Sequence, residues 1–326
     1  MNSLTIWIIA QKGYQDALKN VLFLTLLLFL FSLVGISLMV SAFNFQAQVD
    51  QYNRAITQLQ SMGQSGVILD KPQYFPLQML RGTIEYLEII GAIIGIILGY
   101  ISIAKEKGNN TMQLILSRPI SKLSLIGGKI LGNTLLLFSI LGLIGLFIVF
   151  AISGIGHVAF SQAELFKLFL GLLFSYLYLM VFFCLSTLLS LFFKSLPNAL
   201  IVGFIIWLLI VLIIPQIGDT MDPDNQVPGG LFNSLHMDTH QQQQVMTNFK
   251  TYETWRNILE ESSVEKHYER LTFATLGIKS IYNGKDLRSI FQDQWGNFLW
   301  LIGFYIGSIA SAFYFSNNRK FLSKSN

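Results

Sequence analysis

Six long apolar runs constrain this chain more than any other feature of its sequence. They cover about residues 21–43, 82–104, 130–153, 165–193, 199–217 and 298–315. A run of about 20 apolar residues crosses a bilayer as a helix, because the hydrocarbon core forces each segment to satisfy its own backbone polar groups. The sequence therefore predicts an all-α integral membrane protein with six transmembrane helices.

The composition agrees with a large lipid-facing surface. Of the 326 residues, 52% are hydrophobic and only 12% are charged, whereas about a quarter of a soluble domain is charged. The net charge of +4 would suggest nucleic acid in a soluble protein, but here the cations lie at the ends of the spans. We therefore expect membrane lipid, and no nucleic acid, as a partner. Cys184, the single cysteine, excludes an intrachain disulfide.

The segment between the second and third runs predicts the orientation. Residues 105–132 carry five Lys or Arg against one acid, Glu106, and a short loop with such an excess stays in the cytoplasm. Six spans then place both termini in the cytoplasm, in the cell inner (cytoplasmic) membrane. By the same parity residues 218–296 lie outside, so the predicted units are 1–217, 218–296 and 297–326.

Two polar segments are expected to add helices to the six spans. Residues 1–20 combine an apolar side with lysines and with Trp7 and Tyr14, which predicts an amphipathic interfacial helix; a plain cytoplasmic lead-in is the alternative. Residues 46–60 could extend the first span out of the membrane. Residues 218–296 predict a small helical extracytoplasmic domain, in which a capping box of Ser262 and Glu265 opens a helix that ends near Gly277.

The basic loop also has an internal pattern. Polar and apolar residues alternate from Thr111 to Leu116, and the pattern stops at Ser117-Arg118-Pro119. Proline disfavours helix at the preceding residue and suits the first turn of the next helix. We expect a short helix, a break, and a second helix that starts near Pro119 or Ser121.

This loop resembles the first cytoplasmic loop of ABC (ATP-binding cassette) type-2 permeases. The residues that fit the family pattern are Glu106, Thr111, Leu114, Leu116, Ser117, Arg118, Pro119, Lys129 and Gly132. One departure is Asn110, which stands where the pattern has glycine; asparagine tolerates left-handed backbone better than most residues.

The resemblance implies a dimer of six-span halves, formed with a second copy or a related permease. Each half docks through residues 105–129 on a separate ABC ATPase subunit, which binds ATP and Mg; this chain needs no cofactor. The expected ATPase contacts are Glu106, Thr111, Met112, Gln113, Leu114, Leu116, Ser117, Arg118 and Pro119.

The expected function is therefore that of a permease subunit of an ATP-driven exporter, for a lipid-like, peptide or amphiphilic substrate. The chain has no Walker A, HExxH or GxSxG motif, so we expect no catalysis of its own. The alternatives are a membrane sensor or assembly scaffold that binds an extracytoplasmic protein, and a permease of a copper-handling or sodium-exporting ABC system.

Two further groups of residues carry expectations. Gly91, Gly95 and Gly99 recur every four residues in the second span, which lets another helix approach closely, in the same bundle or in a second subunit. His236 and His240 would share a helix face and, with Met246, suit copper. Two histidines lack the further ligands of a usual metal site, so none is predicted there. Glu85 and Glu88, at the outer end of the second span, are expected to be solvated.

Overall fold

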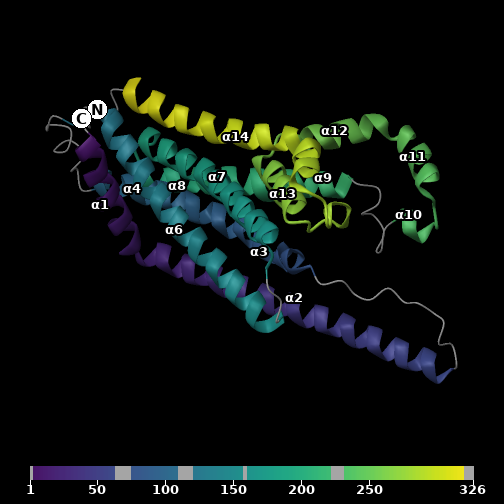
Figure 1. Cartoon of the computed structure of the whole chain (residues 1–326). Coiled ribbons are helices and arrows are strands. Elements are labelled where there is room, and N and C mark those ends of the chain that lie inside the picture. The colour runs from purple at the N-terminus through teal and green to yellow at the C-terminus, as the bar shows by residue number, and fades with distance from the viewer. Residues whose placement is uncertain (1–2, 63–74, 109–119, 157–159, 222–230, 319–326) are drawn as a thin grey trace.

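The computed structural model describes residues 3–62, 75–108, 120–156, 160–221 and 231–318. Within these residues every regular element is a helix (Figure 1). Six helical segments are long and apolar enough to cross a membrane, as the sequence predicts. The all-α, six-span fold class is therefore confirmed.

The six spans are longer than the apolar runs from which they were predicted. They are α2 (Val21–Ser61); η1 (Pro76–Leu80), α3 (Arg81–Tyr86), η2 (Leu87–Gly91) and α4 (Ala92–Gly108) in succession; α6 (Lys122–Gly156); α7 (Gln162–Phe192); α8 (Leu196–Trp207), η3 (Leu208–Ile213) and α9 (Ile214–Met221) in succession; and α14 (Leu287–Asn318). At ~1.5 Å per residue, α2 is about 60 Å long and reaches well past a ~30 Å hydrocarbon core. The predicted extension of the first span is thus present.

Helix α1 (Ser3–Leu18) precedes the spans and lies along α6. Leu4, Trp7 and Ile8 are exposed, whereas Ala10 and Ala17 are buried. One side of α1 therefore packs on the bundle and the other presents apolar side chains outward, as an interfacial helix does. The start of α1 and the end of α14 lie together in Figure 1. We call this the terminal end of the bundle, and the opposite end the insert end.

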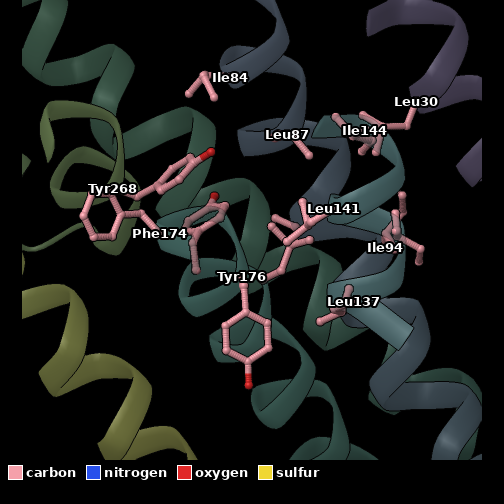
Figure 2. Close-up of a cluster of buried hydrophobic side chains, with 14 of the residues drawn as sticks. Leu30, Ile84, Leu87, Ile94, Leu137, Leu141, Ile144, Phe174, Tyr176 and Tyr268 are labelled. Atoms are coloured by element: carbon pink, nitrogen blue, oxygen red, sulfur yellow. The ribbon is translucent and has the colours of Figure 1, made fainter. Parts of the chain in front are cut away.

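The centre of the bundle is α7, against which α4, α6, α8, α13 (Val264–Thr275) and α14 all pack. Figure 2 shows side chains from several of these helices meeting in one core, with Leu137 and Leu141 of α6 facing Ile94 of α4. Tyr178 of α7 stacks on Tyr268 of α13 at 4.5 Å between ring centroids. Burial raises the pKa of Tyr268, so its hydroxyl stays neutral.

The glycine face of the second span packs against α7 of the same chain. A Cβ on Gly95 would lie 2.7 Å from the carbonyl oxygen of Leu179, and one on Gly99 would meet the carbonyl oxygen of Phe183. A Cβ on Gly91 would lie 3.2 Å from a methyl of Leu179. The three glycines thus bring two helices of one bundle into close contact.

The polar segment between the fifth and sixth spans contains α10 (Leu231–Ser234), α11 (Thr239–Asn248), α12 (Lys250–Glu261), α13 and η5 (Ser280–Tyr282), which we call the insert. Its α13 shares the core of the spans, since Tyr268 and Leu271 are fully buried there. The stretch from 287 to 295 is continuous with the sixth span in α14. Helix α13 therefore completes the bundle, and the division of the chain at 218–296 stays a prediction.

The predicted capping box is wrong by one residue. Ser262 ends α12, and its hydroxyl donates to the Leu259 carbonyl at 2.6 Å. Ser263 caps α13 instead: its hydroxyl accepts from the Glu265 N–H at 3.2 Å and donates to the Ile210 carbonyl at 2.7 Å. Because α12 continues through Glu261, Ser262 has helical backbone and the first non-helical position is Ser263.

The expectation that Glu88 is solvated is also wrong. Its side chain is buried, and it lies near the carboxyl group of Glu265 on α13. Glu88 lies in the π-helical turn η2, and its backbone carbonyl accepts from the Tyr178 hydroxyl at 3.0 Å. The sequence could not reveal this environment, because α13 supplies it from 177 residues farther along the chain.

Candidate functional site

The predicted coupling loop connects α4 to α6 at the terminal end. Helix α4 ends at Gly108, and α6 begins at Lys122. The Ser121 hydroxyl accepts from the Ser124 N–H at 3.0 Å, so the second helix starts where the sequence predicts. The expected contact residues Thr111, Met112, Gln113, Leu114, Leu116, Ser117, Arg118 and Pro119 lie outside the described residues. The structure describes the two helix ends that hold the loop, and Glu106.

A buried ion pair joins the two helix ends. Lys129 Nζ of α6 lies 2.8 Å from Glu106 Oε2 of α4, with only 6% and 10% of the two side chains exposed. Lys129 Nζ also donates to the Ser102 carbonyl. Because a single buried charge is costly in an apolar bundle, each of the two side chains requires the other. The ion pair therefore fixes the spacing of α4 and α6 just inside the loop.

Helix α1 attaches to the same two helices. Lys12 Nζ lies 4.0 Å from Glu106 Oε1, and Asp16 pairs with Lys105 of α4 at 2.6 Å. These contacts are partly exposed, so each adds little to stability. They nevertheless connect α1 to α4 on one side of the loop.

Two glycines of α6 let α1 pack closely against it. A Cβ on Gly128 would lie 2.7 Å from the Cβ of Ile9, and one on Gly132 would meet the backbone of Ala10. Only glycine lets the two backbones approach this closely. The Gly128-Lys129 pair and Gly132 of the family pattern thus have a structural role. The two glycines let α1 pack closely on α6, and Lys129 forms the ion pair with Glu106.

The end of α4 also contacts the central helix. Lys107 Nζ donates to the Ser190 carbonyl at 2.9 Å and to the Phe193 carbonyl, at the carboxyl end of α7. A lysine there satisfies carbonyl groups that the helix leaves unpaired. A small separate core nearby is formed by Ile103, Leu125, Ile126 and Ala312. The end of α4 that leads into the loop thus contacts α1, α6, α7 and α14.

Glu106 is also an expected ATPase contact. In the bundle its carboxylate pairs with Lys129, and the residue is only 8% exposed. The ATPase contact stays a prediction. Sequence reasoning missed Lys12, Asp16 and the pairing of Lys129. One signal was available: Lys129 stands seven residues inside α6, next to an apolar run, where an unpaired cation is expensive.

The histidine pair does not form the arrangement that the sequence suggested. His236 is exposed with φ of 52°, and it precedes Asp238, the N-cap of α11. The two histidines therefore do not share a helix face, since His236 lies before the helix that contains His240. Among the residues that the structure describes, no three His, Cys, Asp or Glu side chains are grouped to hold a metal ion.

Comparison with known proteins identifies the family. No curated protein matches this chain. The family described as "ABC-2 family transporter protein" matches residues 7–320, which include most of α1, all six spans and the insert. Six membrane-crossing helices and a basic loop tied to an interfacial helix agree with a multi-pass permease that works with an ATPase partner subunit. The chain belongs to the ABC-2 transporter family.

Proposed function

We propose that this chain forms the membrane path of an ATP-driven exporter, and that residues 105–129 receive the stroke of a separately encoded ATPase. The observation that carries the proposal is the buried Glu106–Lys129 ion pair between α4 and α6. A loop that passes on motion must have its two ends held together. Otherwise a push on the loop would bend it without moving the bundle.

The proposed stroke passes from the loop to the centre of the bundle. ATP and Mg bound by the ATPase close its two copies, and the closure displaces the loop. Because Glu106 and Lys129 hold α4 and α6 together, both helices tilt. The close packing of Gly95 and Gly99 against α7 transfers this tilt to the central helix, since packed interiors shift as units rather than deform. Helix α1 moves with them and slides at the membrane surface.

The proposed orientation follows the positive charges. Lys105, Lys107, Lys122 and Lys129 lie in the first and last parts of the loop at the terminal end, and Lys194 lies in the short connection between α7 and α8. This excess supports a cytoplasmic terminal end, with both chain termini in the cytoplasm and the insert outside. The membrane in this proposal is the cell inner membrane. A second copy of the chain, or a related permease, forms the other half of the path.

The test removes the apolar contacts of the loop without touching the bundle. In Leu114→Ala with Leu116→Ala, two leucine side chains are lost from the proposed ATPase interface, and each truncation costs about 2–5 kcal/mol when the side chain is buried. Copurification of the ATPase should fall more than about tenfold. Membrane insertion and the thermal unfolding temperature should remain as in the wild type.

The matched control is Leu143→Ala with Leu146→Ala, two exposed leucines on α6. This control should retain the ATPase and its activity. A loop variant that unfolds would mean that its leucines belong to the bundle core. One that still recruits a fully active ATPase would mean that the loop does not couple.

A further inference from the structure

A groove of about 550 Å³ runs along the membrane-spanning part of the molecule, between α8–η3 and α14. Leu185 of α7 lies at its base, and Ile206 and Ile210 form one wall. Gly303, Gly307 and Ser311 of α14 form the other wall, and no residue that lines it is charged. Its size is within the ~300–1,000 Å³ range of small-molecule sites.

The groove is open because small residues of α14 have no partner helix. A Cβ on Gly303 or on Gly307 would have no atom within 4 Å, whereas Gly95 and Gly99 of α4 are packed against α7. Helices α8 and α14 both pack on α7 and leave the groove between them. Small residues four apart give a smooth helix surface on which another helix or an extended chain can pack closely.

The length and depth of the groove match one leaflet of a bilayer. From Trp300 to Ser311 it follows α14 for eleven residues, or about 16 Å, which is about half of a ~30 Å hydrocarbon core. Trp300 marks the insert end, where aromatic residues favour the membrane interface. Only 17% and 11% of the apolar windows in the fifth and sixth spans are buried by this chain, so both walls of the groove belong to spans that expose most of their apolar surface.

The apolar surface continues beyond the membrane onto α12. Ser262, the C-cap of α12, lines the insert end of the groove. Ile258 and Trp255 precede it by four and seven residues, on the same face of the helix, and they are 51% and 61% exposed. A molecule that leaves the groove at this end therefore meets further apolar side chains outside the bilayer.

We infer that this groove binds one acyl chain of a phospholipid from the leaflet at the insert end. The headgroup lies near Ser262, and the face of α12 that bears Trp255 and Ile258 receives the chain when it leaves the bilayer. Acyl-chain binding stands by itself. The further step, in which the bound phospholipid is the exported cargo, rests on the proposed function.

The experiment uses the full-length chain in phospholipid vesicles that contain a phospholipid with a photoreactive acyl chain. Photolabelled residues are identified by mass spectrometry, first without an ATPase. The wild type should be labelled at Ile206 and Ile210. In Gly303→Leu with Gly307→Leu, leucine side chains fill the groove from positions where nothing is displaced. Labelling of Ile206 and Ile210 should fall about tenfold, equal to about 1.4 kcal/mol.

The matched control is Gly296→Leu, another open glycine of α14 that does not line the groove. It should leave the labelling unchanged, and both variants should unfold at the same temperature. Undiminished labelling after filling would overturn the inference. So would a wild-type chain in which Ile206 and Ile210 are not labelled.

A second arm adds the ATPase and ATP and separates the two proposals. If the groove is labelled as expected and ATP does not alter the labelling, acyl-chain binding stands and export of this lipid is wrong. If the ATPase is never recruited, the proposed function fails while the binding result is unaffected.

Discussion

The ion pair between Glu106 and Lys129 allows the sharpest test of how the terminal end is held together. Glu106→Ala leaves the Lys129 ammonium buried with the Ser102 carbonyl and no carboxylate. Lys12→Ala removes instead the distant, exposed cation of the same cluster, whose side chain is 56% exposed and 4.0 Å from Glu106. The two changes remove an ionic contact of the same carboxylate, one buried and one exposed.

The burial of each pair sets the expected magnitudes. Removing one partner of a buried pair costs about 3–5 kcal/mol, because the remaining charge is neither hydrated nor paired. An exposed pair contributes about 1 kcal/mol or less. With a shift of about 2–4 °C per kcal/mol, Glu106→Ala should lower the unfolding temperature by about 6–20 °C. Lys12→Ala should lower it by no more than about 4 °C.

A double variant completes the cycle. Glu106→Leu with Lys129→Met removes both charges and keeps apolar volume, a replacement that is often neutral or stabilising. Its unfolding temperature should lie closer to that of the wild type than that of Glu106→Leu alone. Unfolding can be followed by the fluorescence of the five tryptophans in purified protein.

The reasoning fails if Glu106→Ala is no more harmful than Lys12→Ala. It also fails if the double variant loses the sum of its two single losses, since independent effects would mean that the two side chains do not depend on each other.

Two further predictions concern packing and orientation. Gly99→Ala should destabilise the chain by about 1–3 kcal/mol, because the new Cβ would meet the Phe183 carbonyl, whereas Gly142→Ala, with nothing within 4 Å, should be neutral or stabilising in the same thermal scan. Single cysteines introduced at the exposed Ser195 and Thr254 should react with an impermeant thiol reagent from opposite sides of the membrane. The native Cys184 is buried and should not react. Reaction of both introduced cysteines from one side would contradict the proposed topology.

The sequence alone determined the six spans and most of their ends. An uncharged run of about 20 residues has one stable conformation in hydrocarbon, so each span is decided within its own segment. Helix starts are equally local: Ser121 caps α6 and Ser161 caps α7 because their side chains reach N–H groups three residues ahead. The family pattern could be read in the same way, since its residues are close together in the chain.

Tertiary structure decided which partner each side chain meets. The sequence indicates that Lys129, beside an apolar run, needs a partner, but not that Glu106 is that partner, because their proximity depends on how α4, α6 and α1 pack. Glu88 is buried for the same kind of reason, since α13 returns from the insert to lie against it.

The glycines give the plainest case. Gly95 and Gly99 in α4 have the same four-residue spacing as Gly303 and Gly307 in α14. The backbone of α7 packs against the first pair, and the second pair faces an open groove. The spacing determines only that a helix face lacks side-chain bulk. The presence of another helix at that face depends on the packing of the whole bundle.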